Sequence, residues 1–346
     1  MKVLNKLLIF TFVAFIIQQG VFFYIENIYL SSNMDIKIEK SDDSEVSKNE
    51  QKEVELKEDV DDLKVSSNGR YVAGLQNGRL KVLDSDENKY KDIKNNVNSN
   101  IVFYKWVTNS DRIIAIQKIK EKGRSYFEPV AFNAKNGEQI ELADFDLNKL
   151  RVRVENSEDK VEDIPFSIGT HSLYIKIKKS NEKSDLYYAN TMNQLEKKRS
   201  NKEIGNIVIP TTGANAIMEM GTQVTILDKP DNLLIPNTKN PKLLGTDIND
   251  NVYFASEVNN KVVKIYYAIS SDNYKDWKEF KLDNPVNKED ILVDYSGKVY
   301  INDNEKKTAV ELTSKKTIKY KGELIQTYSK GVISKNGNKL IKNSII

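Results

Sequence analysis

A long apolar run near the start of the chain constrains this sequence more than any other feature. Leu7 to Ile25 reads LLIFTFVAFIIQQGVFFYI and contains no charged residue. About nineteen such residues are enough for a helix to cross the hydrocarbon core of a bilayer. The chain that follows is polar and shows the alternation of β-strands. The sequence therefore predicts one membrane anchor followed by one exported domain.

The flanks of this run favour an uncleaved anchor over a signal peptide. Lys2 and Lys6 precede it and supply the positive charge that stays in the cytoplasm. The run is longer than the apolar core of a secretory signal, which has about 7–15 residues, and the bulky stretch Phe23 to Glu26 offers no cleavage site between small residues. We therefore expect a single-pass protein of the cell membrane with an extracytoplasmic C-terminal domain. A cleaved signal peptide and a buried core helix are the alternatives.

Composition divides the chain into three parts. Residues 1–30 hold the signal-anchor helix. Residues 31–62 contain twelve acidic residues and five lysines, a composition that cannot bury enough apolar surface to order itself. We expect an acidic flexible tether there, with a marginal helix from Val54 to Lys64. Residues 63–346 are expected to form the folded domain, and they carry a net charge of about +9.

This uneven charge has two interpretations. One is the ordinary solubility of a surface and a linker. The other is attraction of the basic domain to an anionic cell-surface polymer or to lipid headgroups, an attraction that salt would screen. Nucleic acid is not expected as a partner, because the lysines are scattered and the domain is exported.

Two absences limit the chemistry of the domain. The sequence has no cysteine, so it predicts neither disulfides nor thiolate metal sites nor a cysteine nucleophile. His171 is the only histidine. A two-histidine metal site cannot be built from it, and no Gly-x-Ser-x-Gly motif accompanies it to suggest a serine hydrolase. We expect His171 in a turn or on the surface, and we expect no metal and no cofactor.

Short strand-turn units recur along the domain. Apolar residues alternate with polar ones, as in Leu173 to Lys178 and Val263 to Ile269, which is the pattern of half-buried strands. Asn-Gly pairs such as Asn77-Gly78 punctuate them, and these favour tight hairpin turns. The units begin near Ser66, Asn109, Gly169, Gly213, Ile248, Tyr295 and Tyr328.

The units are spaced roughly 33–60 residues apart. A period near 40–45 residues with several strands in each unit is typical of propeller blades. We expect an all-β fold, a single β-propeller of about seven blades after one N-terminal transmembrane helix, although six to eight blades fit the spacing. The last unit is short, so the first strand after the tether is expected to complete the last blade. Tandem β-sandwiches are the alternative architecture.

Three segments resemble a known superfamily. SSNGRYVAG from Ser66, KWVTNSDRIIAI from Lys105 and VAFNAKNGEQIEL from Val130 resemble blades of WD-repeat-like propellers of the TolB and dipeptidyl-peptidase N-terminal type. The resemblance implies a fold and says little about activity, because propellers host many functions.

A second resemblance is local. Ser270 to Trp277 reads SSDNYKDW and resembles the Asp-box hairpin of sialidase-like propellers, with Ser270, Asp272 and Trp277 in matching positions. Tyr274 replaces the glycine of that motif. The resemblance implies a structural role, in which the aspartate caps a hairpin and the tryptophan packs inside the blade.

Several weaker patterns bear on ligand binding. Asp84, Asp86 and Asn88 have the spacing of calcium ligands, but Lys89 stands where the loop needs glycine. Asp247, Asn249 and Asn251 show a similar spacing and are expected to form a turn.

Acidic and aromatic residues give two further patterns. Asp144 and Asp146 would share one face of a strand, as the acid pair of a glycosidase requires. Trp106 and Trp277 would either line a sugar-binding surface or pack between blades.

The sequence leaves two hypotheses for the function of the domain. The first is a non-catalytic binding or scaffold module for a protein, a peptide or a cell-surface polymer. The second is an exported hydrolase or lyase that acts on glycan. Since the sequence lacks a catalytic motif, we expect the first. The side chains in the central channel of the ring should distinguish the two.

Overall fold

A computed structural model describes residue 18 and residues 51–56, 60–93, 99–143, 146–190 and 193–344. All the strands belong to one compact unit, Lys48–Ile346. Within these described ranges no helix has both the length and the apolar character that a membrane crossing needs. The predicted anchor and the predicted tether as far as residue 50 lie outside them, except for Gln18, which is helical.

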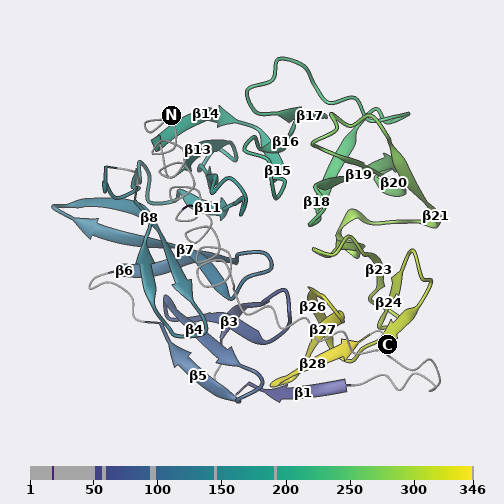
Figure 1. The fold of residues 1–346 in the computed structure, drawn as a ribbon, viewed down its shortest axis with the longest axis horizontal. Coiled ribbons are helices and arrows are strands. Elements are labelled where there is room, and N and C mark those ends of the chain that lie inside the picture. Colours follow the sequence, from purple (N-terminus) through teal and green to yellow (C-terminus); the bar gives the residue numbers. More distant parts are fainter. Residues whose placement is uncertain are drawn as a thin grey trace, which may run out of the picture. The chain divides into compact units, whose positions relative to one another are not determined.

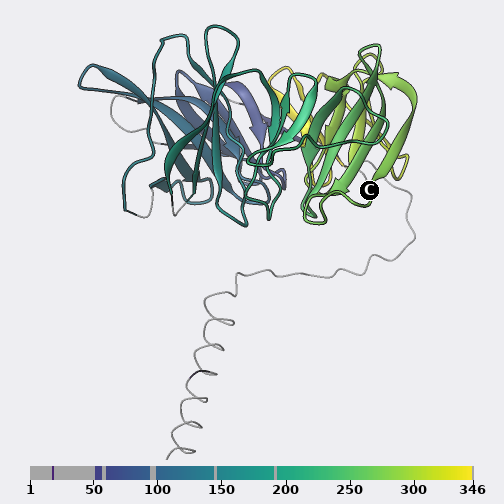
Figure 2. The same ribbon diagram turned by 90° about the horizontal axis from the view of Figure 1, so that it is seen from above.

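The described residues form seven antiparallel β-sheets that stand around a common centre (Figure 1). In the view from the side, the strands run between the two faces of this ring (Figure 2). Each sheet is one blade, so the domain is a seven-bladed β-propeller. The prediction of an all-β propeller of about seven blades is confirmed, and the tandem β-sandwiches are not formed.

Blades 1 to 3 take up the first half of the ring. Blade 1 consists of β2 (Asp61–Val65), β3 (Tyr71–Gln76), β4 (Arg79–Asp84) and β5 (Lys89–Asp92). Blade 2 consists of β6 (Ser99–Trp106), β7 (Arg112–Glu121), β8 (Arg124–Asn133), β9 (Gln139–Glu141) and β10 (Val152–Arg153). Blade 3 consists of β11 (Lys160–Asp163), β12 (Leu173–Lys178), β13 (Ser184–Asn190) and β14 (Asn193–Lys202).

Blades 4 to 6 follow, and in the described residues blade 4 has three strands. Blade 4 consists of β15 (Ile204–Val208), β16 (Ile217–Met220) and β17 (Gln223–Ile226). Blade 5 consists of β18 (Pro241–Thr246), β19 (Asn251–Val258), β20 (Lys261–Ile269) and β21 (Lys278–Val286). A 3-10 helix, Lys288–Asp290, leads into blade 6, which consists of β22 (Ile291–Val293), β23 (Val299–Asp303), β24 (Thr308–Glu311) and β25 (Thr317–Lys319).

Blade 7 joins the two ends of the chain. Its β26 (Glu323–Tyr328), β27 (Gly331–Asn336) and β28 (Lys339–Ser344) come from the C-terminal end, and its outer strand β1 (Gln51–Glu55) comes from the N-terminal side. β1 pairs with β28 in antiparallel register. The predicted closure of the last blade by an N-terminal strand is therefore confirmed, although the closing strand is β1 and not the first strand after residue 62.

β1 lies inside residues 31–62, which the sequence analysis assigns to the tether. The short helix expected from Val54 to Lys64 is wrong, since the structure has β1 and β2 in this range. The reason is tertiary: Val54 and Leu56 are buried against blade 7, and the exposed Glu53 forms an ion pair with Lys339 across the strands at 2.8 Å. Pairing with β28 outweighs the acidic composition of the segment.

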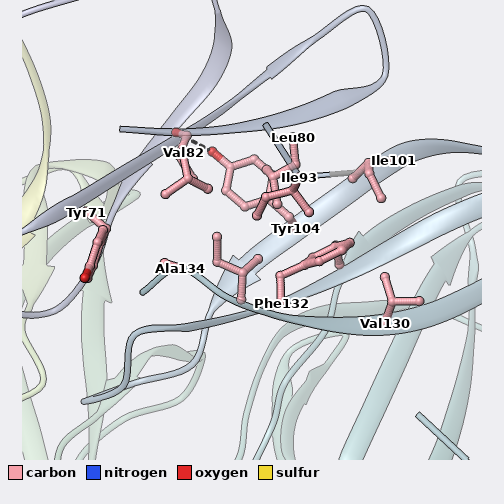
Figure 3. Close-up of a cluster of buried hydrophobic side chains, with 12 residues drawn as sticks. Tyr71, Leu80, Val82, Ile93, Ile101, Tyr104, Val130, Phe132 and Ala134 are labelled. Carbon is pink, nitrogen blue, oxygen red and sulfur yellow. Dashed lines mark hydrogen bonds between the residues drawn. The ribbon is translucent and has the colours of Figure 1, made fainter. Parts of the chain in front are cut away.

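Apolar clusters fill the space between neighbouring blades. Figure 3 shows the cluster between blades 1 and 2, where Leu80 and Val82 meet Tyr104 and Phe132. The buried Tyr104 hydroxyl donates a hydrogen bond of 2.8 Å to the carbonyl of Ala73 in blade 1. Comparable clusters lie at the other junctions of the described blades. Burial of these faces is the main term that holds the ring together.

Candidate functional site

The inner strands of the blades end on one face of the ring. These strands are β2, β6, β11, β15, β18, β22 and β26. Three of the cavities that described residues line open where these strands pass into their turns, with volumes of about 470, 410 and 190 Å³. Thr108 and Val293 line all three. The cavities therefore join into a single recess, which we call the mouth of the central channel.

Polar side chains of the channel wall connect neighbouring blades. Gln326 of blade 7 accepts a hydrogen bond from the Val65 nitrogen at 2.9 Å and donates one to the Val65 carbonyl at 2.7 Å, so its amide extends the pairing of blade 1. Asn206 of blade 4 donates to a backbone carbonyl of blade 5 at 2.9 Å. These groups hold the ring in shape, and their hydrogen-bonding capacity is largely used.

The charged side chains that line the mouth are Lys64, Lys105, Asp163 and Asp294. Three of them are paired. Lys105 and Asp163 form an ion pair of 2.9 Å between blades 2 and 3. Lys64 pairs with Asp62 at 2.7 Å and also donates to the Tyr104 carbonyl at 3.0 Å. Asp294 is the exception in the described part of the wall.

Turns at the rim of the mouth are bonded to one another across most junctions. The bonds join Ser329 N to Ser67 O, Asn109 N to Ser67 Oγ, Gly169 N to Thr211 O, Thr212 N to Asp250 Oδ1 and Ile248 N to Tyr295 O, at 2.9 to 3.2 Å. Blades 2 and 3 are joined one layer deeper, by Lys105 and Asp163. Between blades 6 and 7 the described residues form no such bond.

The remaining surface of the mouth is neutral. Hydroxyl and amide side chains at the rim alternate with aromatic and aliphatic ones, among them Ser67, Asn68, Thr108, Phe166, Thr246, Tyr295 and Ser329. Trp106 is half-buried, with its indole N–H fixed on the Lys64 carbonyl at 3.0 Å and its ring stacked on Tyr71. Trp106 thus both packs between blades 1 and 2 and lines the mouth. A recess of this kind suits a ligand that binds through shape and hydrogen bonds.

The Asp-box-like residues lie away from the mouth, in the turn between β20 and β21. Trp277 packs against Phe254 and Tyr274, with ring centres 5.6 and 6.0 Å apart. Tyr274, at the position of the motif's glycine, has a φ of 57°. Ser270 N is bonded to the Asp250 carbonyl, and Asp272 is exposed. The structure thus places the tryptophan in the blade and the aspartate in solvent.

The calcium-like spacing lies in the turn between β4 and β5. Asp84 is buried, and its carboxylate accepts hydrogen bonds from Arg70 and from the backbone N–H groups of Asp86 and Glu87. Burial alone would raise the pKa of Asp84, but these donors bring it below its ordinary value. Asp86 pairs with Lys52 of β1 at 2.6 Å. The carboxylates therefore join the closing strand to blade 1.

The other sequence-predicted residues do not meet in one place. His171 is exposed in the turn before β12, with a φ of 53°. Asp247 accepts hydrogen bonds from Asn249 and Asn251 and forms a turn, as predicted. The pair Asp144 and Asp146 cannot be described, because residue 144 lies outside the described residues. Within the described ranges, no group of three or more metal-ligating side chains is found.

Comparisons with known proteins identify the fold. No family model matches the sequence, and no curated protein matches it. A chain in the crystal structure of a mitotic checkpoint complex matches with a TM-score of 0.50 at 8% identity, over 90% of this chain and 99% of that one. The β-propeller domain of Myceliophteria thermophila Cps50 (Swd1) matches with a TM-score of 0.51 at 8% identity, over 82% and 96%. Dipeptidyl peptidase 4 of Porphyromonas gingivalis gives 0.41 at 9% identity, over 79% and 42%.

The first two matches cover most of both chains, and the Cps50 (Swd1) match is described as a β-propeller domain. The predicted resemblance to WD-repeat-like propellers is therefore confirmed at the level of the fold. Identities this low carry no information about ligands, so the function has to be argued from the mouth itself.

Proposed function

We propose that this protein is a membrane-anchored, extracytoplasmic propeller that binds a protein, a peptide or a cell-surface polymer at the mouth and catalyses no reaction. The observation that carries the proposal is that the polar side chains of the wall are bonded between blades. Apart from Asp294, they leave a neutral recess of hydroxyl, amide and aromatic groups. A glycan hydrolase needs carboxyls free to exchange protons. Two carboxyl groups line the described mouth, and Asp163 is held by Lys105 and by the backbone N–H of Ile164. Of these two only Asp294 is left, and a glycosidase uses a pair of carboxyl groups.

A bulky residue at the centre of the mouth should abolish partner binding. Thr108 lines all three cavities, so Thr108→Trp should fill the recess while the blades stay intact. The measurement is the amount of partner that co-purifies with the full chain after cross-linking on cells. Thr222→Trp is the matched control, because Thr222 is exposed in the turn between β16 and β17. Equal loss of partner in both variants, or no loss in Thr108→Trp, would contradict binding at the mouth.

Retention of the anchor is a second expectation. Lys2 and Lys6 flank the apolar run, and no cleavage site between small residues follows it. Mass spectrometry of the mature protein should therefore find peptides from before Leu30, and protease added to intact cells should degrade the propeller. A mature N-terminus that begins after Leu30 would mean that the run is a cleaved signal.

A further inference from the structure

At the junction between blades 6 and 7 the described residues form neither a bond at the rim nor a deeper ion pair like that between blades 2 and 3. The length of the turn between β26 and β27 explains why this bond is missing. In blade 7, Tyr328 pairs with Gly331, so only Ser329 and Lys330 form the first turn. The corresponding turn of blade 6 runs from Val293 to Val299. The short turn of blade 7 does not reach the rim of blade 6, and the cavity of about 410 Å³ opens between them.

Two buried polar atoms at this junction have no partner in the described structure. They are Asp294 Oδ2 and the Tyr300 hydroxyl. Asp294 is only 4% exposed and lines the cavity. Its other oxygen, Oδ1, accepts hydrogen bonds from Ser296 Oγ at 2.7 Å and from Lys298 N at 3.0 Å. The burial of Asp294 raises the pKa of its carboxyl above the ordinary value.

Blade 5 contains the same arrangement with all its bonds made. Asp247 precedes Tyr253 by six residues, as Asp294 precedes Tyr300. Asp247 Oδ2 accepts hydrogen bonds of 2.8 Å from both Asn251 Nδ2 and the Tyr253 hydroxyl. Gly297 of the next blade packs directly on this pair. The aspartate at this position therefore has hydrogen-bond partners for both oxygens between blades 5 and 6, whereas one of its oxygens has no partner in the described structure between blades 6 and 7.

We propose that the mouth between blades 6 and 7 is a subsite for a lysine or arginine side chain of a partner protein or peptide, with Asp294 Oδ2 as its acceptor. A buried carboxylate without a counter-ion costs several kcal/mol, and a bound cation removes this cost. The lysines of the cavity do not serve as that counter-ion, since Lys64 and Lys105 are paired with other aspartates. The charge of Lys298 favours the ionised form of Asp294, but Asp294 Oδ2 has no bonded partner among the described residues. Trp106 and Tyr295 line the same cavity and supply aromatic surface for a cation.

This inference rests on the proposed function and names the partner's chemistry. Its test uses Trp106 as a reporter, because the sequence has two tryptophans and Trp277→Phe removes the other. The probes are the peptides acetyl-Gly-Gly-X-Gly-Gly-amide, where X is arginine, lysine or the uncharged arginine analogue citrulline. In the full chain, the arginine and lysine peptides should change Trp106 fluorescence saturably, and citrulline should bind at least about tenfold more weakly.

The decisive variant is Asp294→Asn, with Asp247→Asn as its matched control. Asp294→Asn should weaken binding of the arginine peptide at least about tenfold without lowering the unfolding temperature, because it removes an uncompensated charge. Asp247→Asn should lower the unfolding temperature and leave peptide binding unchanged.

Three results would overturn the inference. One is binding that is equal for arginine and citrulline. Another is binding of the arginine peptide that survives Asp294→Asn undiminished, which would reject Asp294 as the acceptor. The third is no saturable signal with any peptide. The proposed function is judged separately, by partner capture with Thr108→Trp.

Discussion

Removal of residues 51–56 is expected to open the ring and to lower the free energy of unfolding by roughly 4–6 kcal/mol. These residues bury Val54 and Leu56 in the cluster between blades 7 and 1, and β1 covers the outer edge of β28 from Lys339 to Asn343. Loss of two buried aliphatic side chains accounts for most of this value. The rest comes from the exposed edge of β28, which also invites aggregation.

The measurement is chemical denaturation of two shortened chains, one that begins at Gln51 and one that begins at Lys57, so that β2 and the buried Val60 stay in both. The first should unfold cooperatively, and the second should unfold at much lower denaturant or aggregate. Val54→Asp in the longer chain should have a similar effect, since it places a charge in the cluster. Glu55→Ala is the control, because Glu55 is exposed and its loss should cost no more than about 0.5 kcal/mol. Equal midpoints for the two shortened chains would show that β1 does not close the ring.

This expectation changes how the tether can be tested. One interpretation of the basic charge of residues 63–346 is attraction to an anionic polymer, and on that interpretation the acidic segment would compete with the polymer for the domain. A deletion that reaches Asp62 would remove β1 together with the tether. Only residues before Gln51 can be deleted without damage to blade 7.

The repeat pattern predicted the blades because it follows their turns. Each unit found in the sequence begins near the turn between the first and second strands, for example Ser66 in blade 1 and Tyr295 in blade 6. Those turns carry small and polar residues at fixed places, so the sequence shows them clearly. The fold class and a blade number of about seven follow from this spacing.

The inner strands were harder to recognise in the sequence. The mouth, which these strands line, was therefore hard to predict as well. β11 and β22 have only four and three residues, and they end on side chains as different as Asp163 and Val293. A residue such as Gln326 has no local signal, because its partner Val65 lies 261 positions away. The spacing of Asp294 and Tyr300 could be read by comparison with Asp247 and Tyr253. The absence of hydrogen bonds to Asp294 Oδ2 and to the Tyr300 hydroxyl in the described structure could not be predicted, since it depends on the length of the turn in the next blade.

The closing strand shows the same limit. β1 reads QKEVE and has one apolar residue, so its composition matches the tether that precedes it. Whether this segment forms a strand is decided by its pairing with β28, which lies nearly 300 residues further along the chain. Tertiary pairing of this kind outweighs local propensity.

The passage from blade 6 to blade 7 gives the second large prediction. Gly322 has a φ of 79°, and a Cβ added there would lie 2.0 Å from the backbone oxygen of Lys335. Two effects therefore disfavour a side chain at this position. The backbone is in the left-handed region, and the carbonyl of Lys335 cannot move away without shifting β27. Gly322→Ala should lower the free energy of unfolding by about 3 kcal/mol or more.

Gly137→Ala separates the two causes. Gly137 has nearly the same φ, 74°, but an added Cβ meets nothing within 4 Å. Its substitution should cost only the backbone strain, about 1–2 kcal/mol, and denaturant midpoints measured side by side would give the difference. Equal losses would mean that the contact with Lys335 is relieved without cost. Gly322 directly precedes β26, which carries Gln326 into the channel wall. We therefore expect Gly322→Ala to disturb binding at the mouth, whereas Gly137→Ala leaves binding intact.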